Sequence, residues 1–181
     1  KKKKKNWLKT IHSNFHIKSL KSKYPIGEKS SLTAVKGCLQ GIDEIMKNKY
    51  KNIFCAVRPP GHHALNTGKH EGFCFYNHIA ISAKYIQNKY KLRKILIIDW
   101  DYHHGNSTEL FFYNDPSVLF FSTHDANAYP RTGLPERTGS GKGKGYNVNI
   151  HLPCGTTDKK IISTYENKLV KKANIFTNLF S

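Results

Sequence analysis

Apolar residues along the chain follow either a helical or a strand-like spacing. A recurrence every three to four residues predicts helices over residues 32–49, 75–90, 107–113 and 158–173. Ser30 or Ser31 is placed to cap the first of these helices, and Thr157 or Asp158 the last. Short uninterrupted apolar runs predict strands at residues 53–57, 95–99, 117–122 and 146–150.

The strand-like runs lack alternation of polar and apolar residues, and they alternate with helices along the chain. This pattern is typical of a parallel sheet that is covered by helices on both faces. We therefore predict an α/β fold with three layers, α/β/α, around a mainly parallel sheet. The length of 181 residues is enough for one domain with a sizeable core and short for two.

Residues 1–29 are polar and basic, with "KKKKK" at the start and the turn sequence "YPIG" at 24–27. We expect little regular structure there, and a folded domain over residues 30–181. The formal net charge of +18 would suit nucleic acid, but most lysines are spread along the chain rather than gathered on one helical face. A solvated lysine-rich surface is the simplest explanation, and nuclear targeting or polyanion binding by the lysine run remains open. No sequence-specific nucleic-acid binding is expected.

The four cysteines, Cys38, Cys55, Cys74 and Cys154, form no CxxC pair and lie in mostly apolar surroundings, as reduced thiols do. No apolar run approaches the 18 residues that a membrane span needs, and no signal-peptide core follows the basic start. We therefore expect a soluble protein of the nucleus or cytoplasm, without membrane association.

Polar side chains cluster directly behind the run at 95–99, in the sequence "IIDWDYHHGNST" of residues 97–108. In an extended segment Asp101 and His103 would project to the same side and could hold one ion. A carboxylate oxygen and an imidazole nitrogen suit zinc, and a catalytic zinc keeps one position open for water. Asp99 would lie deeper, where it could orient a histidine ring. A capping aspartate followed by surface histidines is the alternative.

A second cluster, "RPPGHH" at residues 58–63, follows the predicted strand at 53–57. Neutral imidazole suits proton transfer near pH 7, so His62 and His63 are candidates for general acid and base. The carboxyl ends of parallel strands meet at one edge of a sheet, where ligands bind. Both clusters are therefore predicted to share a cleft at that edge.

The stretches "RPPGHHA", "GFCFYNHIA" and "ILIIDWDYHHGNSTELFFYNDPSVLFFSTH" resemble the zinc-dependent histone deacetylases, and class II more than class I. The resemblance extends over residues 30–172 and implies an arginase/deacetylase-like fold. It implies that Asp101 and His103 are zinc ligands and that His62 and His63 handle protons. It also implies that Asp99 lies behind His62 and Asn106 behind His63, where class II enzymes usually have Asn.

The same resemblance implies a channel for the acyl-lysine side chain. Gly72 would offer its carbonyl to the substrate amide, while Phe73 and Tyr129 would form opposite walls, although plain core packing of both aromatics is the alternative. The family usually has Phe in place of Tyr129, and Gly in place of Arg131, which would crowd the channel mouth. Family members also bind a potassium ion near the zinc, at the positions of Asp99, Asp101, His103 and Ser122.

The family's third zinc ligand, an Asp in a stretch like "SAGFDA", and its transition-state Tyr both come later than Ser181. The chain is therefore expected to be the front part of a catalytic domain, incomplete at its C-terminus, and to be inactive alone. Among its other aspartates, only Asp125 follows the carboxyl end of a predicted strand and could substitute as a ligand.

These residues predict a zinc-dependent deacetylase of acetyl-lysine in histone tails or other proteins, with corepressor-type complexes as possible partners. An acetylpolyamine amidohydrolase of the same superfamily is the enzymatic alternative. Arginase-like manganese chemistry is less favoured, because a second metal needs further carboxylates. A catalytically incomplete scaffold is the alternative from another class.

Overall fold

The computed structural model describes residues 6–178, which fall into two compact units divided between Leu92 and Arg93. The division at 92/93 differs from the boundary at 29/30 that the sequence suggested. No helix within the described residues combines the length and the apolar character that a membrane crossing requires.

The first unit is helical. Ser13 and Asn77 cap two of its helices, because their side chains accept hydrogen bonds from the backbone N–H of His16 and Ala80. The helices are η1 (Trp7–Thr10), α1 (Asn14–Lys23), α2 (Pro25–Met46) and α3 (His78–Tyr90). Their buried core consists of Leu8, Leu20, Val35, Tyr76 and Ile81.

The expectation of little regular structure over residues 1–29 is wrong for the described part of that segment. η1, α1 and the start of α2 occupy most of it, because a few apolar residues such as Leu8 and Leu20 reach the core. α2 begins at Pro25, a favourable first helical residue, and not behind a serine cap. The lysine run at residues 1–5 lies outside the described residues.

The predicted strand at residues 53–57 is also wrong. Ile53, Cys55 and Val57 lie against α2, close to its glycines Gly37 and Gly41, while the intervening Phe54 is 93% exposed. The segment therefore packs on a helix, and no ladder pairs it with another strand among the described residues.

The second unit contains the parallel sheet that the sequence predicted. Its strand order is β1-β2-β3, and both pairings are parallel. The central strand is buried along its whole length, whereas the two outer strands are partly exposed. The strands are β1 (Ile95–Asp99), β2 (Val118–His124) and β3 (Asn147–His151).

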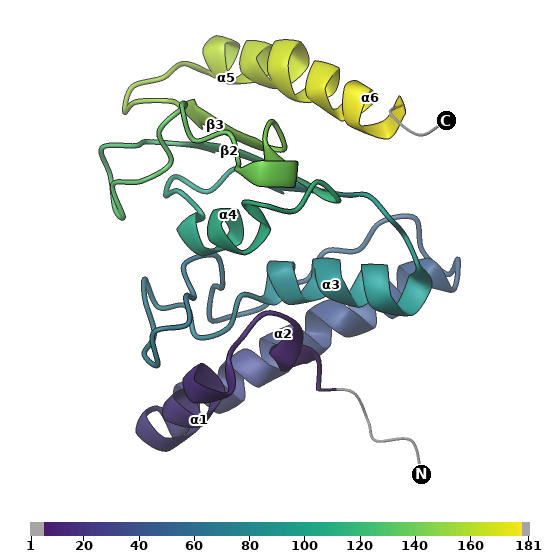
Figure 1. The fold of residues 1–181 in the computed structure, drawn as a ribbon, viewed down its shortest axis with the longest axis vertical. Coiled ribbons are helices and arrows are strands. Elements are labelled where there is room, and N and C mark those ends of the chain that lie inside the picture. The colour runs from purple at the N-terminus through teal and green to yellow at the C-terminus, as the bar shows by residue number, and fades with distance from the viewer. Residues whose placement is uncertain (1–5, 179–181) are drawn as a thin grey trace. The chain divides into compact units, whose positions relative to one another are not determined.

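Helices cover both faces of this sheet, as predicted. Figure 1 shows α4 on one side of β2 and β3, and the long C-terminal helical segment on the other. That segment starts behind the cap residue Thr157, one of the two caps that the sequence proposed. Its parts are α5 (Asp158–Thr164), the π-helical η3 (Tyr165–Val170) and α6 (Lys171–Asn178), and the remaining helices are α4 (Asn106–Phe112) and η2 (Gly141–Gly143).

β1 is an outer strand that still has apolar side chains on a partly open face. Leu96 and Ile98 are 36% and 38% exposed, and Trp100, next in the same alternation, is 77% exposed. Among the described residues β1 pairs with β2 alone.

Candidate metal and substrate site

The polar residues of the second unit gather at the carboxyl ends of its strands. The sheet register pairs Asp99 with Ser122, and His124 with His151. Beyond β1 the chain bends instead of continuing as a strand, because Asp99 accepts a hydrogen bond from the N–H of Asp101 at 3.2 Å. Asp101 in turn accepts one from the N–H of His103 at 2.7 Å.

These two turns bring Asp101 and His103 together. The sequence had predicted the same proximity from an extended segment, which is not what the structure shows. Aspartate side chains commonly bond the backbone two residues later and turn the chain. Oδ1 of Asp101 lies 3.2 Å from Nδ1 of His103, and both side chains are about half exposed. Two ligand atoms bound tetrahedrally to one zinc ion would lie about 3.3 Å apart. The pair therefore fits the geometry of two zinc ligands.

The remaining candidates around this pair differ in their surroundings. Within residues 6–178, no group of three His, Cys, Asp or Glu side chains is arranged to hold a metal ion. Asp125, the candidate substitute ligand, accepts hydrogen bonds from the Asn127 N–H and the Tyr102 hydroxyl, both at 2.9 Å. These bonds, that of Asn127 foremost, lower the pKa of Asp125. Asp125 therefore holds loops together and does not join Asp101 and His103.

Ser122 is buried beside the candidate ligands. Its hydroxyl forms a 2.8 Å hydrogen bond with Nδ1 of His124, whose Nε2 donates to the carbonyl of Gly133 at 2.9 Å. Burial, opposed in part by that backbone bond, lowers the pKa of His124 to about 4. His124 is therefore a neutral ring that links the end of β2 to the following loop.

Tyr129 lies in that loop, with its ring centroid 6.2 Å from that of His103 in an edge-to-face arrangement. Its side chain is 49% exposed, which does not fit plain core packing. Arg131 adopts a positive φ of 61°, a backbone conformation that favours glycine. The resemblance described above, in which Gly is usual at this position, is consistent with that backbone.

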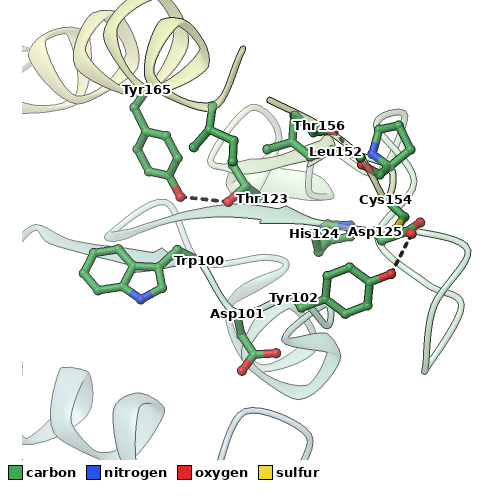
Figure 2. Close-up of a pocket in the computed structure, with 13 residues that line it drawn as sticks. Trp100, Asp101, Tyr102, Thr123, His124, Asp125, Leu152, Cys154, Thr156 and Tyr165 are labelled. Carbon is green, nitrogen blue, oxygen red and sulfur yellow. Dashed lines mark hydrogen bonds between the residues drawn. The ribbon is translucent and has the colours of Figure 1, made fainter. Parts of the chain in front are cut away.

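A pocket of about 340 Å³ opens beside these residues, on the side of α5 and η3. Figure 2 shows Tyr165 reaching from η3 to Thr123, with which it forms a 2.7 Å hydrogen bond, and Tyr102 reaching to Asp125. Trp100, Leu152 and other side chains complete the lining. Sequence reasoning did not identify this pocket.

His62 and His63 belong to the first unit and lie in contact, with ring centroids 4.0 Å apart. They follow a tight turn in which the N–H of Ala64 donates to the carbonyl of Gly61. His63 is 3% exposed, and His62 is half-buried. His78 is a neighbour of His62. Burial, and to a smaller extent the nearby His62, lower the pKa of His78. The turn thus presents two imidazole rings together.

Gly72 and Phe73 form a tight turn in the same unit, between Glu71 and Cys74, which pair as an isolated bridge. Both have positive φ, 50° and 63°, and the Phe73 side chain is 77% exposed. A bulky residue in a left-handed conformation is costly, and a large exposed aromatic gains nothing from burial. This combination favours a functional role for Phe73 over core packing.

Sequence reasoning missed a buried polar network behind the candidate ligands. Nδ1 of His104 lies 2.8 Å from the Thr132 hydroxyl, and its Nε2 lies 3.4 Å from Glu109. Burial alone would raise the pKa of Glu109, but four polar neighbours of its carboxylate outweigh that effect and lower the pKa to about 2. Those neighbours are His104, Asn149, Arg137 and Asn147. The second histidine of an HH pair gave no sign of this separate role.

Comparisons with known proteins show the family of the chain. A sequence model of the histone deacetylase domain matches residues 1–178. A protein of Archaeoglobus fulgidus named "Probable deacetylase" is 41% identical over 150 residues, 83% of this chain and 41% of that protein. Human histone deacetylase 9 is 46% identical over 118 residues, 63% of this chain and 12% of that protein.

The fold agrees as well. The crystal structure of the HDA15 HD domain superposes with a TM-score of 0.88 at 32% identity, covering 96% of this chain and 55% of that one. The chain thus spans about half of the solved domain and less than half of the archaeal relative. It belongs to the histone deacetylase family and fits the N-terminal part of the catalytic domain.

Proposed function

We propose that this chain is part of a zinc-dependent lysine deacetylase, which hydrolyses acetyl-lysine amides and releases acetate. The observation that carries the proposal is the 3.2 Å separation of Asp101 Oδ1 and His103 Nδ1 at the carboxyl end of β1. Membership of the deacetylase family supports it.

Asp101 and His103 would hold the zinc ion. When bound, zinc polarises a carbonyl and lowers the pKa of a coordinated water. Catalytic zinc usually has three protein ligands, so a full-length enzyme would add one to this pair. A potassium ion is proposed nearby, at Asp99, Asp101, His103 and Ser122, where it would partly offset the two carboxylates.

His62 and His63 would move the protons of the reaction. One ring takes a proton from the attacking water, and one returns a proton to the leaving lysine amine. Asp99 would orient His62, and Asn106 would orient His63, as hydrogen-bond partners of a histidine commonly do.

Two exposed aromatic rings, one in each unit, are proposed to contact the substrate. Phe73 and Tyr129 would enclose the apolar stem of acetyl-lysine, and the carbonyl of Gly72 would accept a hydrogen bond from the substrate amide. We propose acetylated histone tails or other acetyl-lysine proteins as substrates. The enzyme would act on them in the nucleus or cytoplasm, within corepressor-type complexes.

The test uses a full-length protein that contains this chain, stripped of metal with a chelator and assayed on an acetyl-lysine peptide. We expect turnover to return with zinc and to be blocked by a hydroxamate, which chelates the metal. An acetylated polyamine is assayed in parallel, because the archaeal relative shows that this sequence pattern is not confined to eukaryotes. Preference for the polyamine would replace the protein substrate, and absence of any zinc-dependent turnover would leave a scaffold role.

The chain of residues 1–181 alone is expected to be inactive and to bind zinc weakly. Stoichiometric zinc together with turnover in this chain would contradict that expectation. It would show that the two ligands after β1 are enough, or that another residue of the chain completes the site.

A further inference from the structure

The adjacent residues His103 and His104 do different work. The His103 side chain is 43% exposed beside Asp101, whereas the His104 side chain is 1% exposed and directed into the core of the second unit. There His104 forms its 2.8 Å hydrogen bond with Thr132, in the loop that follows β2.

The next residue of the loop, Gly133, is also held by a buried histidine. The carbonyl of Gly133 accepts a hydrogen bond from His124, and Gly133 has a positive φ of 81°. A Cβ at this position would lie 2.6 Å from ring carbons of His104 and closer still to Nε2 of His124. The backbone therefore lies directly on two buried imidazole rings.

Glu109 holds the end of the loop. Its carboxylate accepts a hydrogen bond from Arg137 at 2.6 Å, and from Asn147 and Asn149 at 2.8 and 2.6 Å. The Arg137 guanidinium also lies 4.8 Å from the ring centroid of Tyr113. Loss of the charge would leave three buried or half-buried donors poorly paired, which is costly in a protein interior.

Tyr129 lies three residues before Thr132, in the same loop, with its ring beside that of His103. Two short-range backbone hydrogen bonds shape this part of the loop, from the N–H of Ala128 to the carbonyl of Asp125 and from the N–H of Arg131 to the carbonyl of Ala128. Beyond Tyr129, the buried network fastens the same loop at Thr132, Gly133 and Arg137.

We infer that Glu109 and His104 are positioning residues, which hold the loop at Thr132 and Arg137 so that Tyr129 forms a fixed wall beside His103. The inference rests on the proposed function, which makes Tyr129 one wall of the acyl-lysine channel. Glu109 and His104 would act on substrate binding through Tyr129, without touching substrate or metal.

The test compares Thr132→Val and Glu109→Gln in a full-length deacetylase that contains this chain. We expect KM for an acetyl-lysine peptide to rise about tenfold, the scale of one lost buried hydrogen bond, with kcat and zinc content little changed. In a Tyr129→Ala background the effect of Thr132→Val on KM should vanish, because the wall is already gone. Thr164→Val is the matched control, a 5% exposed threonine whose hydroxyl donates to Lys160 within α5.

Trypsin cleavage after the exposed Arg131, followed by mass spectrometry, tests the anchoring without any activity. Both network variants should be cut at least about tenfold faster than the wild type, and Thr164→Val at the wild-type rate. Unchanged cleavage would overturn the anchoring role. Faster cleavage with an unchanged KM, or with a KM effect that persists in Tyr129→Ala, would overturn the link to Tyr129. A wild type without zinc-dependent turnover would refute the proposed function, and cleavage would still decide the anchoring.

Discussion

The imidazole rings of His12 and His16 stack in the core of the first unit, with centroids 4.8 Å apart. His12 accepts a hydrogen bond from the N–H of Asn77 and contacts Asn66, while His16 accepts one from the N–H of Gly68 and donates to the carbonyl of Phe75. Two neutral rings thus fasten the N-terminal helices to the loop that carries His62, His63 and Phe73.

This pair predicts that the first unit loses stability in mild acid. Burial lowers the pKa of His12 to about 3 and also lowers that of His16, although Asn66 and the Phe75 carbonyl oppose the shifts. Because the unfolded chain binds these protons near pH 6.5, the stability is complete above that pH and is lost as the pH falls toward the folded value. For His12 we expect a loss of about 2 to 3 kcal/mol between pH 6.5 and 4.5.

Urea unfolding of a Trp100→Phe variant measures this effect, because Trp7, which packs on Tyr85 in the first unit, is then the remaining tryptophan. The pH dependence should flatten in His12→Gln/His16→Gln, even though that variant is less stable at pH 7.5. The same slope in both proteins would assign the acid sensitivity to other groups.

Asp101→Ala should abolish zinc binding and hydroxamate binding in a full-length enzyme. Loss of an outer hydrogen-bond partner already costs metal affinity about 10- to 100-fold, so loss of a ligand should cost more. Metal content after dialysis is the measurement. Asp115→Ala is the control, since the Asp115 carboxylate accepts hydrogen bonds from the N–H and the hydroxyl of Ser117 and lies at the amino end of β2. Retained stoichiometric zinc in Asp101→Ala would contradict the ligand assignment.

His63→Ala should lower kcat by about 100-fold or more, the usual contribution of a positioned acid or base, and leave zinc content unchanged. Single-turnover kinetics would separate the chemical step from product release. His70→Ala, in the same loop region, serves as the comparison. Near-normal turnover in His63→Ala would remove His63 from the proton-transfer role.

Phe73→Ala and Phe73→Gly should both raise KM for acetyl-lysine peptides, because each removes the exposed ring. They should differ in stability, since glycine relieves the left-handed conformation and alanine does not. We expect the glycine variant to be more stable than the alanine variant by about 1 kcal/mol, visible as a higher Tm. Equal KM in wild type and both variants would show that the ring does not contact substrate.

Much of the second unit could be predicted from sequence because its local signals agree with its packing. The run at 95–99 is β1 residue for residue, and Thr157 caps the last helical segment as expected. The run at 53–57 is also apolar, but it packs against α2 and not beside a neighbouring strand. A sequence reports that a segment is apolar and does not report which surface it meets.

The candidate site was predictable in its residue types and less so in its construction. The proximity of Asp101 and His103 could be predicted from their spacing, but the two aspartate turns that join them depend on backbone geometry. The roles of His104 and Glu109 could not be seen, because their partners Thr132 and Arg137 are 28 residues distant along the chain. The catalytic roles of His62, His63, Asp99 and Asn106 remain predictions.

The open face of β1 has a consequence for how this chain behaves in solution. Leu96, Ile98 and Trp100 form a partly exposed apolar row on β1 and just beyond it. The outer backbone groups of β1 have no ladder partner among residues 6–178. Such an edge can template the addition of another strand, and the high positive charge of the chain would oppose that addition only while salt is low. We therefore expect the purified chain to form oligomers at high ionic strength as its concentration rises. The Leu96→Lys variant should remain monomeric under the same conditions.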